Sequence, residues 1–330
     1  MEISEKGYKP FISIAIITYN RANLLKRNIE NLLNIIKENN YRIEILVLNN
    51  GSTDSSIEVL NNFENEIQVF NYYYNLGINP AISILLNVIK GQYLWFLGDD
   101  DFINKNAFKK TYELLNSDYN FRQSIFFPPK PFEDLVEIDK INTYPNTTKY
   151  NAFKNKNLPT LLLKKAGFIS SHILPTNIFK KHFQDALKEI GVRNNYLVKY
   201  VNILSHKDCY KIIYFKSFVL FASRIKNNRS HFLTESISNK FQTFFVDNHR
   251  VNWYLINKQK INSIEKFKLI MFANTTLGSL IIFYEYFSKM FFSKRLIYIL
   301  TIPISCLLNI IFFLISFAKK NVKSKFKKKI

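Results

Sequence analysis

The chain has 330 residues, of which 47% are hydrophobic and 16% aromatic, and its formal net charge is +21. This length and composition predict a globular protein larger than one typical domain. The only two cysteines, Cys209 and Cys306, exclude a disulfide framework and a C-x-x-C metal site, as expected in a reducing compartment. Residues 1–10 are polar and lack the apolar core of a signal peptide, so we expect the catalytic part to stay in the cytoplasm.

The positive charge does not by itself indicate a nucleic-acid-binding protein. Lysines are concentrated in residues 319–329 and are otherwise scattered along the chain. The sequence has no zinc-finger spacing, no RNA-binding aromatic signature and no heptad basic region. A basic tail behind an apolar segment is typical of contact with anionic lipid headgroups. We therefore expect a membrane surface as a partner and no nucleic acid.

Apolar runs and helix-like periodicity alternate from the N-terminus onward. Strands are predicted at residues 11–17, 43–48, 67–72 and 93–97, and helices at residues 24–36, 57–63 and 80–89. This alternation is typical of an α/β protein with a Rossmann-like, doubly wound and mostly parallel sheet. Each predicted strand ends in polar residues, and the carboxyl ends of parallel strands meet at the edge where ligands bind.

Three consecutive carboxylates follow the fourth predicted strand and mark a candidate metal site. Gly98 is followed by Asp99, Asp100 and Asp101, whose charges repel one another unless a cation lies between them. Mg²⁺ or Mn²⁺ would join such acids to the phosphates of a ligand. No glycine-rich phosphate loop of the dinucleotide or P-loop type is present, so phosphates need another counter-charge. The alternative interpretation is a solvated acidic turn.

Four motifs occur in the order typical of one enzyme family. They are Thr-Tyr-Asn-Arg at residues 18–21, Asn-Asn-Gly-Ser-Thr-Asp at 49–54, Asn-Leu-Gly at 75–77 and Leu-Gly-Asp-Asp-Asp at 97–101. Residues 12–115 therefore resemble the nucleotide-sugar half of a glycosyltransferase family 2 protein, which implies a GT-A fold. The form of residues 95–101 is similar to the abequosyltransferase-like branch, which adds dideoxy or deoxy sugars to bacterial surface glycans.

The resemblance implies roles for the motif residues. Those expected to bind the nucleotide-sugar donor are Thr18, Tyr19, Arg21, Asn49, Asp54, Asn75, Asp99 and Asp100. Those expected to bind Mn²⁺ or Mg²⁺ are Asp99, Asp101 and His231, the last at the end of the basic segment 224–231. Asn49 departs from the family pattern, which usually has an aspartate there, and this loses a charge-assisted hydrogen bond to the donor.

The resemblance also implies inversion at the anomeric carbon, with a general base that deprotonates the acceptor hydroxyl. Family members usually take this base from a Glu-Asp pair on a helix, but residues 191–196 contain no acid at that place. The only Glu-Asp dipeptide, at 133–134, is predicted to lie in a surface loop. Residues 167–173 are predicted to form the preceding strand. The candidates for the base are therefore His172, Asp208 and Glu189.

The C-terminal region is predicted to associate with a membrane. Residues 296–318 contain no charged side chain and are long enough to span a bilayer. A single span would separate the catalytic domain from the basic tail, which should stay cytoplasmic. We therefore expect a hairpin with residues 269–283, or interfacial helices. Either arrangement places the enzyme at the cytoplasmic face of the inner (plasma) membrane, beside a lipid-linked glycan acceptor.

These observations predict three regions. They are a nucleotide-sugar half at residues 1–118, an acceptor half at 119–250, and a helical, membrane-associated extension with a polybasic tail at 251–330. The predicted function is a metal-dependent, inverting hexosyl- or deoxyhexosyltransferase acting on lipopolysaccharide, O-antigen or capsule-type glycans. The alternatives are a catalytically degenerate, membrane-bound protein that binds glycans or nucleotides, and a nucleotidyltransferase. Residues 18–21 lack the glycine-rich loop that a nucleotidyltransferase needs.

Overall fold

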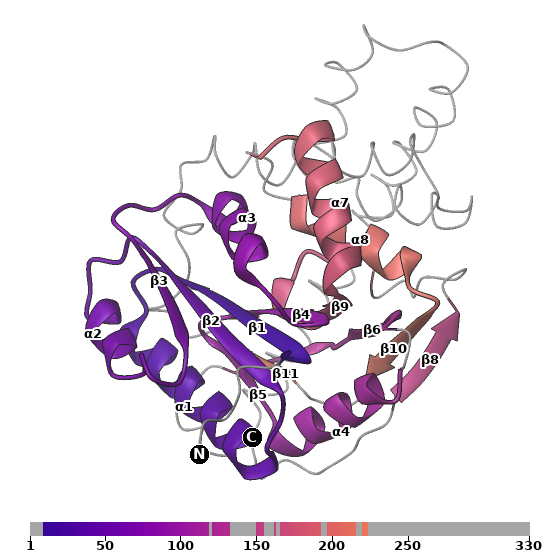
Figure 1. Cartoon of the computed structure of the whole chain (residues 1–330), viewed down its shortest axis with the longest axis horizontal. Helices are drawn as coiled ribbons and strands as arrows, with labels where there is room; N and C mark the ends of the chain where they lie inside the picture. Colours follow the sequence, from indigo (N-terminus) through magenta and orange to yellow (C-terminus); the bar gives the residue numbers. More distant parts are fainter. Residues whose placement is uncertain are drawn as a thin grey trace, which may run out of the picture. The chain divides into compact units, whose positions relative to one another are not determined.

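The computed structural model of the protein describes residues 9–118, 121–132, 150–154, 162, 166–192, 197–215 and 220–223. Strands and helices alternate regularly up to residue 98, as the apolar periodicity predicts (Figure 1). The elements there are β1 (Ile12–Thr18), α1 (Ala22–Asn39), β2 (Ile43–Asn50), α2 (Ser56–Asn61), β3 (Gln68–Tyr72), α3 (Ile78–Val88) and β4 (Tyr93–Gly98).

The second half of the described chain mixes short strands with three further α-helices. Its elements are β5 (Asp101–Ile103), α4 (Lys105–Asn116), β6 (Gln123–Phe126), β7 (Pro129–Phe132), β8 (Tyr150–Lys154), the 3-10 helix η2 (Ile169–Ser171), β9 (His172–Pro175), α7 (Thr176–Glu189), α8 (Leu197–Asp208), β10 (Lys211–Phe215) and β11 (Leu220–Ser223).

The main sheet has eight strands in the order β3-β2-β1-β4-β9-β6-β10-β8. The pairs β1–β2, β1–β4, β2–β3 and β6–β10 are parallel, whereas β9 runs antiparallel to both β4 and β6. A second, three-stranded sheet has the order β5-β11-β7. The predicted Rossmann-like, mostly parallel α/β sheet is thus confirmed, with two reversed strands: β9 at its centre, and β8 at one edge, where it runs antiparallel to β10.

Helices cover both faces of the main sheet, which explains why the strands are apolar throughout rather than alternating. In Figure 1, α1 and α4 lie on one face, and α3, α7 and α8 on the other. Neighbouring residues of β4 point to opposite faces. Trp95 stacks on Phe108 of α4, with ring centroids 6.1 Å apart, whereas Phe96 lies 5.6 Å from Phe179 of α7.

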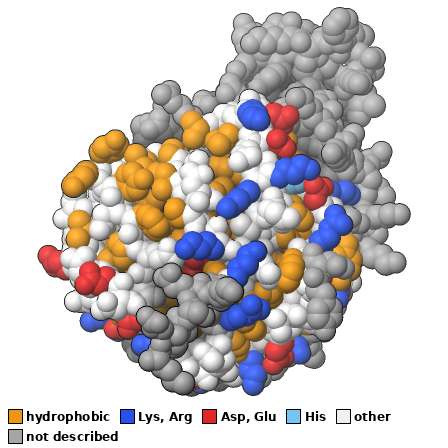
Figure 2. All heavy atoms as spheres, in the orientation of Figure 1, with side chains coloured by type: hydrophobic (Ala, Val, Ile, Leu, Met, Phe, Trp, Pro, Cys, Tyr) orange, Lys and Arg blue, Asp and Glu red, His pale blue; other side chains and the backbone are white. Residues whose placement is uncertain are grey.

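Hydrophobic side chains also gather on the surface. Figure 2 shows them over β3 and the loop that leads to α3. The exposed large hydrophobic side chains of this part of the chain include Tyr73 and Tyr74, which are 101% and 68% exposed. These two tyrosines therefore present aromatic surface to solvent next to the carboxyl end of β3.

One local prediction was wrong. Residues 167–173 were expected to form a strand, but Ile169–Ser171 form a 3-10 helix and the strand begins only at His172. The Ser171 N–H donates to the Phe168 carbonyl at 3.1 Å, which closes this turn. The alternative interpretation of the acids as a solvated turn does not hold, because Asp99 and Asp101 are buried and Asp101 begins β5, where it pairs with Ala222 of β11.

Several predicted segments lie outside the described residues: 224–231 with His231, 269–283 and 296–318. Among the helices that the structure describes, none has the length and apolar character needed to cross a bilayer.

Candidate functional site

The polar motifs come together at one edge of the main sheet. Because β1, β2, β3 and β4 are parallel, the segments that follow them leave the sheet at the same edge. The register places Thr18 beside Asn49 and Ile17 beside Gly98. The motif residues at 18–21, 49–54, 75–77 and 98–101 are thus collected at this edge, which we call the site edge.

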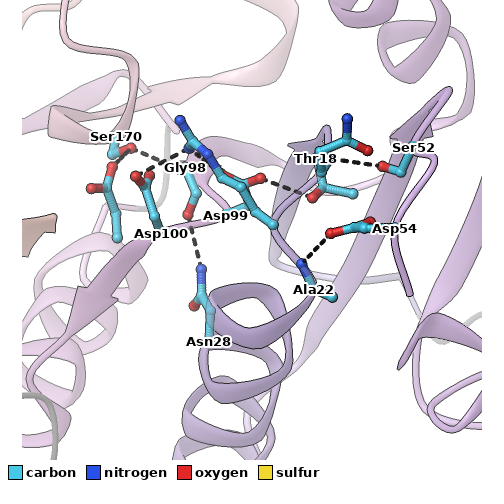
Figure 3. A network of polar contacts seen from close by, with 12 residues as sticks. Thr18, Ala22, Asn28, Ser52, Asp54, Gly98, Asp99, Asp100 and Ser170 are labelled. Atoms are coloured by element: carbon cyan, nitrogen blue, oxygen red, sulfur yellow. Dashed lines mark hydrogen bonds and ion pairs between the residues drawn. The ribbon is translucent and has the colours of Figure 1, made fainter. Parts of the chain in front are cut away.

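A buried arginine–carboxylate cluster lies at the site edge (Figure 3). Asp99 Oδ2 accepts a hydrogen bond from Thr18 Oγ1 at 2.8 Å, and Asp99 Oδ1 accepts one from Arg21 Nη1 at 2.6 Å. The same Arg21 nitrogen is 3.1 Å from Asp100 Oδ2. The cation that the neighbouring acids require is therefore, in this structure, the guanidinium of Arg21.

Burial shifts the protonation of the three acids toward the neutral form. Desolvation raises the pKa of Asp99, against the opposing effect of Arg21. Desolvation and the charge of Asp99 raise the pKa of Asp100 to about 6, and desolvation and the charge of Asp100 raise that of Asp101 to about 8. One guanidinium is thus insufficient to keep all three carboxylates ionised at neutral pH.

Asp101 is held by a residue from a distant part of the chain. Ser170 Oγ donates to Asp101 Oδ2 at 2.5 Å and accepts from the Gly98 N–H at 2.8 Å. Ser170 lies on η2 and is fully buried. Sequence analysis missed this residue, because a serine within a run interpreted as a strand gives no signal.

Asp54 organises the start of α1 rather than facing the acids. Its Oδ2 accepts from the N–H of Ala22 at 3.1 Å, and its Oδ1 accepts from the N–H of Ser56 at 3.0 Å. It therefore caps the helix that follows Arg21, whose own side chain makes no capping bond. Desolvation acts to raise the pKa of Asp54, but the hydrogen bonds from Ser56 and Ala22 outweigh it and lower that pKa.

Two asparagines at the end of β2 use both ends of their amide groups. Asn49 Oδ1 accepts from the Ser52 N–H at 3.1 Å, and its Nδ2 donates to Asn71 Oδ1 at 3.3 Å. Asn50 in the same way accepts from the Leu76 N–H at 2.9 Å and donates to Asn75 Oδ1 at 3.0 Å. An aspartate could not donate, which accounts for an amide at position 49. Asn50 was not predicted as a site residue.

Gly51 brings the β3–α3 loop against this motif. Its φ of +79° is unfavourable for other residues, and a Cβ atom there would lie 2.4 Å from the Tyr74 carbonyl carbon. The backbone at Tyr74 is thus packed directly against residue 51. The exposed rings of Tyr73 and Tyr74 are therefore carried on a backbone that is fixed beside the site edge.

His172 lies in a buried chain of hydrogen-bonded groups. Its side chain is almost completely buried, and its Nδ1 is 2.9 Å from His206 Nε2. His206 Nδ1 is in turn 2.7 Å from Ser124 Oγ. Burial lowers the pKa of His206 well below its ordinary value, so this ring is neutral at pH 7. The predicted base is therefore part of an internal network in the described structure.

The structure does not bring Asp208 to the carboxylates. Its Oδ2 is 2.8 Å from His182 Nε2, and it ends α8 shortly before β10 begins at Lys211. Lys211 pairs with Gln123, the first residue of β6, so Asp208 lies where the parallel strands begin. A strand the length of β4 separates this edge from the site edge by roughly 15–20 Å. The third candidate base, Glu189, lies at the C-terminal end of α7, where its Oε2 accepts a hydrogen bond from Tyr200 Oη at 3.0 Å.

The acids are suited to a divalent cation that is coordinated partly by the protein and partly by the phosphates of a substrate. No three His, Cys, Asp or Glu side chains of the described part converge on one point, because Asp99 and Asp100 face Arg21 and Asp101 faces Ser170. Mg²⁺ is commonly held by one or two carboxylates together with phosphate oxygens and water. Asp99 and Asp101 can supply such carboxylates, with a diphosphate completing the coordination.

The chain is similar in sequence to known glycosyltransferases. Residues 13–173 match the family model described as Glycosyl transferase family 2. A Haemophilus influenzae protein named an uncharacterized glycosyltransferase is 36% identical over 104 residues, which cover 31% of this chain and 40% of that protein. Glycosyltransferase GlyG of Streptococcus pneumoniae is 26% identical over 181 residues, covering 49% of this chain and 59% of GlyG. The chain thus matches less than two thirds of either relative.

A solved structure shares the fold. The crystal structure of S. aureus TarS with UDP-GlcNAc has a TM-score of 0.58 and 15% identity, covering 86% of this chain and 77% of TarS. This confirms the predicted GT-A-like α/β fold. The family model and the names of the relatives agree with the predicted enzyme class, glycosyltransferase. Residues 13–173 are therefore similar to the glycosyl transferase family 2 domain.

Proposed function

We propose that this protein transfers a sugar from a nucleotide-sugar donor to a glycan acceptor, with inversion at the anomeric carbon. The observation that carries the proposal is the buried cluster of Asp99, Asp100 and Arg21, with Asp101 beside it, at the site edge. Support comes from relatives named glycosyltransferases and from the TarS structure, which was solved with UDP-GlcNAc.

We assign the donor to the loops at the site edge. The base and ribose would contact Thr18, Tyr19, Asn49, Asn75 and the segment fixed by Asp54, as the family resemblance implies. Arg21, held between Asp99 and Asp100, would lie next to the ribose and diphosphate. The hydrogen bonds among these residues order the loops before a ligand binds, which lowers the entropy cost of binding.

We further propose that Asp99 and Asp101 bind Mn²⁺ or Mg²⁺ together with the donor diphosphate. When bound, the cation stabilises the negative charge that develops on the leaving nucleoside diphosphate. His231 is proposed as an additional ligand. The support is that the basic segment 224–231 follows β11 in the sequence, and Ala222 of β11 pairs with Asp101.

The acceptor half of the proposal rests on fewer observations. His172 is the preferred general base, since β9 begins at the site edge, whereas a base at Asp208 would act from the opposite edge. Transfer of a deoxy or dideoxy sugar, as in the abequosyltransferase-like branch, is proposed from residues 95–101 alone. The proposed acceptor is a lipid-linked precursor of a surface glycan.

A donor screen tests the central proposal. We expect one class of nucleoside diphosphate sugar to raise the melting temperature in the presence of Mn²⁺, and much less without it, because the cation and diphosphate share ligands. The measurement is thermal unfolding of the full chain with UDP-, GDP-, CDP- and dTDP-sugars, each with Mn²⁺ or with EDTA.

The same screen separates the alternatives. If no nucleotide shifts the melting temperature in the presence of Mn²⁺, the transferase proposal fails. Stabilisation by a donor without transfer, and without hydrolysis of the nucleotide sugar, favours the degenerate binding protein, for which the missing Glu-Asp pair in residues 191–196 is the best argument.

We also propose a division of the chain into the regions 1–118, 119–250 and 251–330, of which residues 251–330 attach the protein to the cytoplasmic face of the plasma membrane. The support is sequence only: the uncharged segment 296–318 and the lysines that follow it. A chain lacking residues 290–330 is expected to move to the soluble fraction after centrifugation, while the full chain sediments with membranes. Continued sedimentation of the shortened chain, with donor binding intact, contradicts this attachment.

A further inference from the structure

Ser170 connects the two halves of the domain at the carboxylate cluster. It lies on η2, directly before β9, yet both partners of its hydroxyl belong to residues 98–101. We propose that Ser170 is a positioning residue, which holds the carboxylate of Asp101 in the orientation needed to bind a divalent cation. This inference rests on the proposed function, because it concerns the same cation and diphosphate.

The hydrogen bonds of Ser170 have only one possible direction. Its oxygen accepts from the Gly98 N–H at 2.8 Å, so its own proton is free to be donated to Asp101 Oδ2, which is 2.5 Å away. The backbone of Ser170 is fixed as well, because its carbonyl accepts from Trp95 Nε1 at 2.8 Å. A fully buried serine fixed at three points leaves the carboxylate little freedom to rotate.

Gly98 makes room for this arrangement. A Cβ atom at position 98 would lie 2.6 Å from Asp101 Oδ2 and 3.1 Å from Asp101 Cγ. The carboxyl group therefore packs on the bare Cα of Gly98, with Oδ2 turned to Ser170. The hydrogen bond from Ser170 uses Asp101 Oδ2, so Oδ1 is the oxygen that we assign to a cation.

The fold contains a matched control for Ser170. At the opposite edge of the sheet, Ser13 Oγ donates to Glu44 Oε1 at 2.5 Å and accepts from the Gly91 N–H at 2.8 Å. Ser13 is also fully buried. Replacing either serine by alanine thus removes the same two kinds of hydrogen bond, but only Ser170 contacts an acid of the cluster.

The experiment compares Ser170→Ala with Ser13→Ala in the full chain. Mn²⁺ is titrated in the presence of UDP, GDP, CDP or dTDP, and free Mn²⁺ is followed by electron paramagnetic resonance. We expect Ser170→Ala to weaken Mn²⁺ binding about 10–100-fold, as is typical when a partner of a metal ligand is removed. Ser13→Ala should lose comparable stability in urea unfolding and keep the wild-type Mn²⁺ affinity.

A second variant covers the case in which Ser170→Ala does not fold. Ser170→Cys keeps the size of the side chain and a weak donor, so its Mn²⁺ affinity should lie between wild type and Ser170→Ala. Wild-type affinity in Ser170→Ala or in Ser170→Cys overturns the inference, as does an equal loss in Ser13→Ala. If the unmodified chain binds no nucleoside diphosphate with Mn²⁺, the proposed function itself has failed, and the two failures are thereby distinguished.

Discussion

Replacing Asp101 by asparagine is expected to abolish the Mn²⁺ dependence of nucleotide binding and to lower kcat at least about 100-fold. Asparagine has the shape of a protonated aspartic acid, and burial raises the pKa of Asp101 to about 8. Its Oδ1 can still accept the hydrogen bond from Ser170, so the fold should be retained. Aspartate can lose its proton and bind a cation through the negatively charged carboxylate, whereas asparagine has no carboxylate and loses this ability. The measurements are donor binding with and without Mn²⁺, and initial rates of transfer.

Glu44→Gln is the control for this variant. Glu44 is another carboxylate that accepts a hydrogen bond from a buried serine, Ser13, but it lies at the opposite edge of the sheet. Its replacement should leave Mn²⁺ binding and kcat unchanged. Wild-type Mn²⁺ dependence in Asp101→Asn would remove Asp101 from the proposed cation site, even if transfer activity itself fell.

The gathering of the motif residues at the site edge could be predicted from the sequence because it follows from local patterns. A buried strand that ends in Gly98 puts Asp99 and the following acids at the edge of a parallel sheet, and Thr18 reaches the same edge by the same rule. The sequence did not indicate that Arg21 lies between the acids. That contact depends on the start of α1, which Asp54 caps from another loop.

The placement of Ser170, His172 and Asp208 could not be predicted, because it depends on the direction of one strand. β9 is only four residues long and runs antiparallel between β4 and β6, and apolar periodicity carries no information about direction. This reversal brings Ser170 to the acids and sends α7 and α8 along the sheet, so that Asp208 ends at the far edge. Ser170 and Asn50 make hydrogen bonds to residues that are far from them in the sequence. Serine and asparagine are common residue types, so the sequence alone does not mark either position as part of a site.

Arg21→Ala is expected to destabilise the protein by about 3–5 kcal/mol at pH 8, because it leaves buried carboxylates without their counter-charge. The loss should be smaller at pH 5. In the folded protein the pKa values of Asp100 and Asp101 are raised to about 6 and about 8, from an ordinary value of 3.8. The folded state therefore binds more protons than the unfolded state between about pH 4 and 8, and stability falls as the pH rises through this window.

Arg21 opposes this loss, since its charge lowers the pKa of all three acids. Without it the folded-state pKa values rise further, so the decrease in stability with pH becomes steeper. Urea unfolding of the wild type, Arg21→Ala and Arg21→Lys at pH 5 and pH 8 measures the effect, with lysine keeping the charge but not the planar guanidinium. An equal loss in Arg21→Ala at both pH values would mean that packing, rather than charge, accounts for the role of Arg21. A larger loss at pH 8 than at pH 5, partly recovered in Arg21→Lys, would instead identify the guanidinium as the internal cation of the cluster. In that case Mn²⁺ and a diphosphate would bind next to the same acids as Arg21.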